Sequence, residues 1–330
     1  MAVSGRAFWL FSVGSWVLLV VVLALAALVG SVPVPVSTLL SNLFDPGGPA
    51  TTAHQILWEI RLPRVFLAAL VGASLAAVGV ALQAVVRNPL ADPYILGSSS
   101  GASTGAALML WLGLPALVKP FAFAGALLAL VLAQGLARQG RRLAPERLLL
   151  AGVAVGYMLA AVTSLLAVMG DQRMTRGVLF WLLGGFSGAT WADLQWPSLV
   201  LLVGSFFLVL QSRALNALSL GEEASLTLGV EPDGFRKQLL ALSAVLTGVC
   251  VSVSGAIGFV GMMVPHLARR LVGADHRRLL PVVLAGGAIL MVLADLLARL
   301  VLAGRELPVG ILTALAGGPF FLWMMAGRRQ

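Results

Sequence analysis

Apolar runs of about 20 residues recur along the whole chain, and this repetition constrains the fold more than any other feature of the sequence. A helix of this length, with a rise of about 1.5 Å per residue, crosses the hydrocarbon core of a bilayer. Of the 330 residues, 59% are hydrophobic and only 11% are charged, so water cannot be the main solvent of the folded chain. The sequence therefore predicts an all-α integral membrane protein that forms a single domain over residues 1–330.

We expect about ten transmembrane helices. The predicted spans are 8–30, 64–86, 94–113, 119–137, 147–169, 195–212, 237–256, 257–270, 279–301 and 307–326. The stretch 237–270 is too long for one helix, and Gly255, Gly258 and Gly261 favour a break near its middle. A short apolar piece, Val178 to Leu183, is expected to re-enter the outer side as a half-helix. The segments 72–93 and 247–270 resemble each other, so an inverted repeat is possible.

The basic residues predict the orientation of the chain. An even number of spans places both termini on one side, and 15 of the 22 lysines and arginines fall on that side. Because cytoplasmic loops carry the excess of basic residues, both termini are expected in the cytoplasm. The net charge of +9 then reports orientation, and nucleic-acid binding is a poor interpretation.

The cytoplasmic segment 213–236 reads RALNALSLGEEASLTLGVEPDGFR and is too polar to span a bilayer. Its leucines are Leu218, Leu220, Leu226 and Leu228, and its acids are Glu222, Glu223, Glu231 and Asp233. This mixture, bracketed by glycines, predicts one or two short amphipathic helices. An exposed apolar face beside acids suits docking on a soluble partner. The alternative is an ordinary connecting loop.

Catalytic and metal-binding signatures are weak in this sequence. Gly185-Phe186-Ser187-Gly188 resembles the G-x-S-G of intramembrane serine proteases, which need a histidine base within hydrogen-bond reach. The three histidines, His54, His266 and His276, are not expected near Ser187, and they lack metal-ligand spacing. No P-loop is present. Any nucleotide-driven work must therefore come from another polypeptide.

Charged residues inside the predicted spans are candidate coupling sites, because such charges are costly in lipid. Asp295 and Arg299 lie one helical turn apart and are expected to form an ion pair. Asp92 follows a helix end and is expected in a capped turn. Both interpretations weaken the case for an ion-coupled secondary transporter, which remains the main alternative.

Two further groups of polar residues have open interpretations. Ser98, Ser99 and Ser100 begin a stretch rich in small residues that could line a polar pathway, or could only pack and bond to their own helix. On the outer side, Arg61, Arg64 and Arg305 are either interfacial anchors or a positive rim that binds carboxylates of an extracytoplasmic partner.

Eight blocks in order along the chain resemble the permease subunits of binding-protein-dependent ABC importers for iron-siderophore, haem and cobalamin, the FecCD-like family. The blocks are RLPR (61–64), GASLAAVGVALQAVVRNPLADPYILGSSSGAS (72–103), RLLLAGVAVG (147–156), WLLGGFSGATW (181–191), SLGEEASLTLGV (219–230), SGAIGFVGMMVPHLARRLVGADHRRLLP (254–281), ADLLARL (294–300) and ELPVGILTALAGGPFFLW (306–323). They extend over nearly the whole chain.

The resemblance implies a homodimer in the inner membrane of a bacterium, surrounded by lipid, with two cytoplasmic ATPase subunits that bind ATP and Mg and an extracytoplasmic substrate-binding protein. It implies an ATPase-coupling segment made of Ser219, Leu220, Gly221, Glu222, Glu223, Ala224, Leu226, Leu228, Gly229 and Val230. It also implies docking of the binding protein at Arg61, Arg64 and Arg299 or Arg305. The expected pathway residues are Tyr157, Met158, Met169, Gln172 and Arg173, with the serines above. Nothing in the blocks separates the three substrates.

Overall fold

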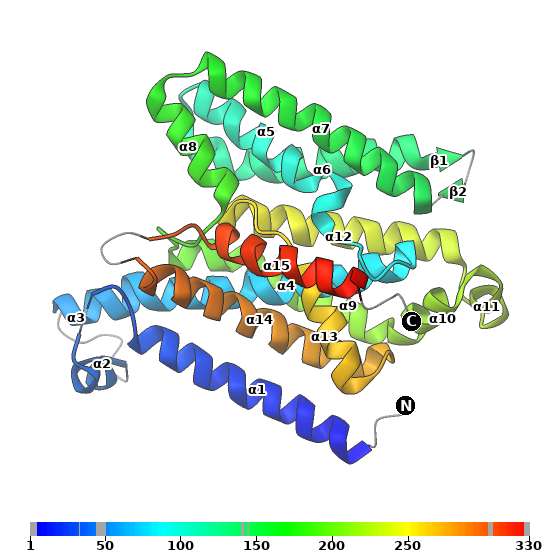
Figure 1. Ribbon diagram of the computed structural model, residues 1–330, viewed down its shortest axis with the longest axis horizontal. Helices are drawn as coiled ribbons and strands as arrows, with labels where there is room; N and C mark the ends of the chain where they lie inside the picture. Colours follow the sequence, from blue (N-terminus) through cyan, green and yellow to red (C-terminus); the bar gives the residue numbers. More distant parts are fainter. Residues whose placement is uncertain are drawn as a thin grey trace.

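The computed structural model describes residues 5–32, 34–43, 51–139, 142–143, 145–302 and 306–326. A bundle of helices forms nearly all of it (Figure 1). The helices that correspond to the expected spans are α1 (Gly5–Leu28), α4 (Leu62–Val86), α5 (Ser98–Trp111), α6 (Val118–Ala137), α7 (Pro145–Met169), α9 (Gln195–Leu210), α12 (Pro232–Ser254), α13 (Val260–Val272), α14 (His276–Leu300) and α15 (Val309–Ala326). The expected all-α membrane fold is confirmed.

Eight described helical segments are long and apolar enough to cross a membrane. The other two expected spans, α5 with 14 residues and α13 with 13, are shorter. Both lie packed against longer helices: α5 against α6 and α7, and α13 against α4 and α14. Protein neighbours can therefore cover the backbone at their ends, which lipid could not satisfy.

Short elements connect the long helices. They are α2 (Val36–Leu43), α3 (Thr52–Gln55), the π-helical η1 (Ile56–Arg61), the 3₁₀ turns η2 (Pro93–Leu96), η3 (Pro115–Leu117) and η4 (Trp191–Leu194), and the helices α8 (Gln172–Leu183), α10 (Ser212–Leu220) and α11 (Glu222–Thr227). Two strands of two residues each, β1 (Arg138–Gln139) and β2 (Arg142–Leu143), pair antiparallel. The predicted half-helix is present as α8.

The central helix of the bundle is α4, which packs against α14, α12 and α13 and is buried along most of its length. Small residues let neighbouring backbones approach it closely. A methyl group added at Gly72 would collide with the carbonyl oxygen of Gly287 in α14, and one at Gly79 with that of Gly261 in α13. Such contacts hold helices together in lipid, where burial of apolar surface contributes little.

The helices α5, α6 and α7 form a second group, which lies above α12 in Figure 1. Gly101 of α5 and Gly125 of α6 face each other with their backbones in contact. The group contacts the rest of the bundle mainly through α12. This arrangement leaves one side of α7 open.

The predicted break between α12 and α13 is confirmed at residues 255–259, where Gly255 and Phe259 have positive φ angles of 67° and 71°. Two side chains bond to buried backbone groups, one within this break and one at the start of α13. The Tyr94 hydroxyl accepts a hydrogen bond from the Ile257 N–H, and Gln83 Nε2 donates to the Gly261 carbonyl at 3.1 Å. Broken helices persist at membrane depth only where protein groups satisfy the backbone in this way.

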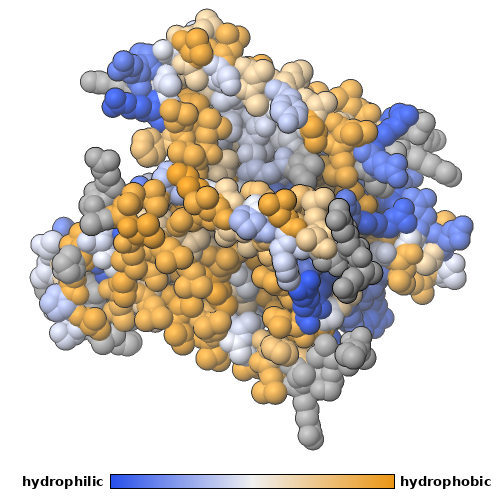
Figure 2. Space-filling model, in the orientation of Figure 1, coloured by the Kyte–Doolittle hydropathy of each residue, from blue (hydrophilic) through white to orange (hydrophobic). Residues whose placement is uncertain are grey.

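The two ends of the bundle differ in the elements they carry. The beginning of α1 and the end of α15 lie at the same end as α10 and α11, whereas α3 and α8 lie at the opposite end (Figure 1). We refer to these as the α10–α11 end and the α8 end. Apolar side chains cover the sides between them, and hydrophilic residues gather toward both ends (Figure 2).

The predicted cytoplasmic loop 213–236 is corrected at its end, because α12 begins at Pro232. The Glu231 side chain accepts hydrogen bonds from the N–H groups of Asp233 and Gly234 and caps the helix. Pro232 stands at the first helical position, where its missing N–H is not needed. The expected capped turn at Asp92 is confirmed, since Asp92 Oδ1 accepts from the Tyr94 N–H at 3.0 Å.

We expect Gly79→Ala to lower the thermal stability of the detergent-solubilised protein, because the added methyl group forces α4 and α13 apart. Overpacking of this kind costs roughly 1–3 kcal/mol. Thermal unfolding followed by intrinsic fluorescence measures the change. Gly14→Ala in α1 is the matched control, because nothing lies within 4 Å of the added group. Equal midpoints for both variants would contradict the close α4–α13 contact.

Candidate functional site

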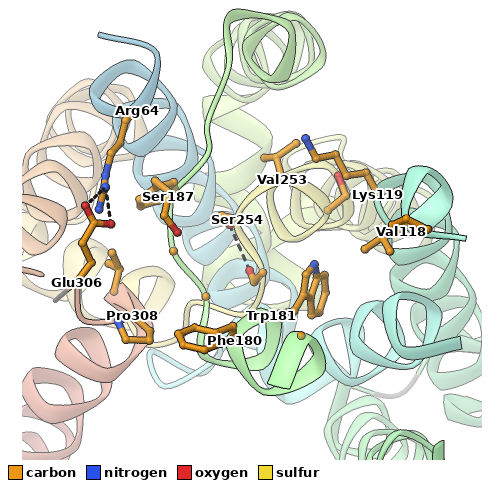
Figure 3. Close-up of a pocket in the computed structure, with 18 of the residues that line it drawn as sticks. Arg64, Val118, Lys119, Phe180, Trp181, Ser187, Val253, Ser254, Glu306 and Pro308 are labelled. Carbon is orange, nitrogen blue, oxygen red and sulfur yellow. Dashed lines mark hydrogen bonds and ion pairs between the residues drawn. The ribbon is translucent and has the colours of Figure 1, made fainter. Parts of the chain in front are cut away.

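A cavity of about 690 Å³ opens at the α8 end of the bundle, between α8, the end of α12 and the residues before α15 (Figure 3). Aromatic side chains, Phe180 and Trp181 of α8, line one wall. Ser187 and Ser254 add hydroxyl groups, and the Arg64–Glu306 ion pair lies on the side opposite Lys119 (Figure 3). The cavity thus combines apolar, hydroxylated and charged surface in one space, which suits an amphipathic ligand.

Three elements meet at this cavity through backbone contacts. The Gly185 N–H donates to the Ser254 carbonyl at 2.8 Å, and the longer Gly310 N–H to Gly184 carbonyl contact is 3.5 Å. A methyl group at Gly255 would collide with the Trp181 carbonyl, and one at Gly310 with the Leu183 carbonyl. We call this meeting of α8, α12 and α15 the glycine junction. Only glycine allows backbones to approach so closely here.

Buried charges lie beside the cavity. Arg64 Nε donates to Asp295 Oδ1 at 2.9 Å, and Arg64 Nη1 donates to Glu306 Oε2 at 2.8 Å. Arg299 Nε lies 3.2 Å from Asp295 Oδ2, so the predicted pair one helical turn apart is confirmed. The Asp295 carboxylate is 1% exposed and is shared by two arginines. This geometry describes a structural ion network that joins α4, α14 and the start of α15.

The expectation that Arg61 and Arg64 stand on an exposed positive rim is corrected by the structure, in which they are 4% and 6% exposed. Arg61 Nη1 donates to the Leu28 carbonyl at 2.7 Å, and Arg61 Nη2 donates to the Val32 carbonyl at 2.6 Å. Arg299 Nη2 donates to the Ala26 carbonyl at 3.2 Å. Two arginines therefore satisfy carbonyl groups at the end of α1 that its own turns leave free. Arg305 lies outside the described residues.

The predicted coupling segment folds as α10 and α11, separated by Gly221. Leu215 and Leu218 are buried, so Leu218 belongs to the inner face. Leu226 and Leu228 are 61% and 62% exposed, and Leu220 points outward as well. Ser225 is buried and its hydroxyl donates to the Gly221 carbonyl. We call residues 212–228 the α10–α11 unit. It leaves three leucines exposed to water, as a surface that binds a partner does.

The remaining coupling residues follow the same division. Ser219, Glu222, Glu223 and Gly229 are exposed, whereas Ala224 and Val230 are half-buried. Their role in contacting an ATPase stays a prediction.

The predicted pathway residues lie in two separate places. Ser98 is buried and donates to the Pro93 carbonyl at 2.8 Å, while Ser99 and Ser100 are half-buried. A methyl group added at Gly156 of α7 would lie 3.6 Å from Ser100 Oγ. Thr104, one turn beyond Ser100, bonds to Thr163 of α7 at 2.9 Å. These hydroxyl contacts support the packing interpretation of the α5 serines.

The other pathway residues lie on an open face. Tyr157 is 76% exposed, and Met158, Met169 and Gln172 are exposed along α7 and at the start of α8. The Arg173 side chain is outside what the structure describes. This face of α7 has no described neighbour that covers it, so a partner or lipid must do so in the membrane.

Several candidate residues were missed at the sequence level. Phe180 and Trp181 were assigned only to an apolar half-helix. Arg236 lies in the second turn of α12 and Asn216 in α10, and both make the polar contacts described below. In the sequence, the one signal for Arg236 and Asn216 was a charge or an amide among apolar residues. No histidine is among the described residues that line the cavity holding Ser187.

Comparison with known proteins gives consistent matches over most of the chain. The model of the FecCD transport family matches residues 18–327. The cobalamin import system permease protein BtuC of Halobacterium salinarum is 45% identical over 303 residues, which are 91% of this chain and 81% of that protein. The hemin transport system permease protein HmuU of Yersinia pestis is 42% identical over 292 residues, 85% of this chain and 87% of that protein.

A solved structure agrees with the architecture as well. It is a transporter assigned to the metal-chelate ABC type, in an inward-facing conformation, with a TM-score of 0.84 and 33% sequence identity. The likeness covers 96% of this chain and 98% of that one. The resemblance expected from the eight sequence blocks is therefore confirmed: this chain belongs to the FecCD transport family and is a multi-pass membrane permease.

Proposed function

We propose that this chain is the permease subunit of an ATP-driven importer that carries a large chelate such as cobalamin, haem or an iron-siderophore across the cytoplasmic (inner) membrane. The observation that carries the proposal is the α10–α11 unit, which offers exposed leucines at one end of a membrane bundle. Relatives that match over most of the chain are permeases of import systems for cobalamin and hemin.

The motor is proposed to be a separate ATPase that binds ATP and Mg²⁺ and docks on Leu220, Leu226 and Leu228. These side chains are exposed in the single chain, and burial against a partner would stabilise the complex by roughly 1.5–3 kcal/mol for each leucine. Basic residues concentrate at the α10–α11 end, which supports a cytoplasmic position for it and for both termini. The chain supplies no cofactor in this proposal.

A second copy of the chain is proposed to complete the translocation path. The open face of α7 carries Tyr157, Met158 and Val168, and α15 exposes Leu315 and Leu322. In a homodimer these faces would turn toward each other, while lipid covers the apolar sides that remain. The ligand would then meet mainly apolar and small side chains, with few charges that could hold it in mid-membrane.

The extracytoplasmic binding protein is proposed to dock at the α8 end. Arg61 and Arg64 are occupied by contacts within the chain, so docking would first use groups that stay accessible there. Lys119 and Glu306 also form ion pairs within the chain, with Asp193 and Arg64, but their side chains stay 54% and 39% exposed beside the cavity. Surface charges of this kind set the orientation and rate of encounter more than the affinity.

We expect the double variant Leu226→Glu, Leu228→Glu to reduce co-purification of the ATPase by at least about tenfold, because two apolar contacts become charged. Pull-down of the detergent-solubilised permease with its ATPase, quantified by immunoblot, measures the loss. Leu112→Glu, at an exposed leucine after α5, is the matched control and should retain the ATPase. Undiminished co-purification of the double variant would overturn the proposed coupling surface.

An ion-coupled secondary transporter is the alternative, and the buried acids Asp92 and Asp295 discriminate between the two. We expect ATP-dependent uptake to persist in Asp92→Asn, since asparagine keeps the oxygen that accepts from the Tyr94 N–H. Asp295→Asn should lower stability by about 3–5 kcal/mol, because buried Arg299 loses its ion pair and Arg64 keeps only Glu306. Uptake into proteoliposomes and thermal unfolding measure both effects. If Asp92→Asn abolished uptake and left ATP hydrolysis intact, ion coupling would be favoured.

A further inference from the structure

Two sets of polar contacts join the α10–α11 unit to the bundle, one to α14 and one to α12. In α10, Asn216 Nδ2 donates to Asp275 Oδ1 at 2.8 Å. Asn216 Oδ1 accepts from the His276 N–H at 3.0 Å and lies 2.6 Å from His276 Nδ1. Asp275 is the N-cap of α14 and accepts from the Arg277 N–H. The Asn216 amide therefore bonds to both the N-cap, Asp275, and the first residue, His276, of α14.

The charge state of Asp275 strengthens this contact. Partial burial by itself raises the pKa of the Asp275 carboxyl. The hydrogen bonds from Asn216 and the Arg277 N–H, together with the charges of Arg277 and Arg278, lower this pKa by more, so that it lies below its ordinary value. The carboxylate stays ionised and accepts from the Asn216 amide as a charge-assisted bond.

The second contact runs from α11 to α12 through Arg236, which is 1% exposed. Arg236 Nη1 lies 2.8 Å from Glu222 Oε1 and 3.5 Å from Asp233 Oδ1. Arg236 Nε and Nη2 have no hydrogen-bond partner within the described part of the chain. Loss of the Glu222 bond would leave a buried guanidinium with little compensation, which is costly.

Apolar packing of α11 is slight by comparison. Among the six residues of α11, only Ser225 is buried. The ion pair with Arg236 therefore contributes to holding α11 against α12.

Both anchored helices extend from the α10–α11 end to the cavity at the other end. α12 begins beside Arg236 and ends at Ser254, in the glycine junction. α14 begins at His276 and carries Asp295, which shares Arg64 with Glu306 at the cavity. A displacement of the unit would thus reach one wall of the cavity directly along α12. Along α14 it would reach Arg64 and Glu306 of the cavity through Asp295, because helices are stiff elements.

We propose that Asn216 and Arg236 are positioning residues that transmit movement of the α10–α11 unit to α14 and α12. The inference rests on the proposed function, because the movement would come from a docked ATPase. Arg236 is buried within the chain, so it acts on the partner only through Glu222 and α11.

The test uses the full complex of permease, ATPase and binding protein in proteoliposomes. Uptake and ATP hydrolysis are measured together and expressed as substrate moved per ATP. We expect Arg236→Gln and Asn216→Ala to lower this ratio by at least about fivefold while the ATPase stays bound and hydrolysis continues. Lys237→Gln, an exposed neighbour with the same charge change, should leave the ratio unchanged.

A reciprocal variant separates transmission from mere loss of stability. Glu222→Arg combined with Arg236→Glu restores the opposite charges and should recover part of the ratio relative to Arg236→Gln. If Arg236 variants cannot be purified, the ratio of substrate moved per ATP in Asn216→Ala alone tests the inference. The inference would be overturned if Asn216→Ala and Arg236→Gln moved as much substrate per ATP as the unmodified chain. Failure of the unmodified permease to bind an ATPase would instead overturn the proposed function.

Discussion

Backbone N–H and C=O groups cannot find water inside a bilayer, and the rest of this structure depends on that constraint. Helices satisfy most of these groups internally. Where helices end or break at membrane depth, side chains take over: Gln83 and Tyr94 bond to the backbone at the α12–α13 break, and Arg61 and Arg299 bond to carbonyls at the end of α1. Much of the polar content of the interior therefore completes the backbone and leaves few groups to bind a ligand.

The same constraint explains why small residues dominate helix contacts. Lipid chains are as apolar as leucine side chains, so helices gain little by hiding leucine from lipid, and close backbone approach supplies the attraction. The contacts of Gly72 with α14 and Gly79 with α13 follow this principle. At the glycine junction the approach joins three elements around the cavity. Because these contacts are short, the helices that make them can separate and pack again as rigid bodies. A transport path requires such movement.

The sequence allowed the spans to be predicted because length and hydropathy alone decide whether a helix can cross a bilayer. The break near Gly255 and the Asp295–Arg299 pair were also predictable, since both depend on neighbours in the chain. The burial of Arg61 and Arg64 was not. Arg64 pairs with residues 231 and 242 positions away, and only the fold brings them together. For the same reason the α5 serines, equally able to line a pathway or to bond within the bundle, could not be resolved from their pattern.

We propose that this permease is a passive path, which an external motor moves through the α10–α11 unit. The most direct measurement is substrate accumulation in proteoliposomes that hold the permease with its ATPase, with ATP supplied on the ATPase side and loaded binding protein on the other. We expect accumulation that requires the ATPase, ATP and the binding protein together and does not depend on an ion gradient. Accumulation by the permease alone, driven by a proton or sodium gradient, would contradict it.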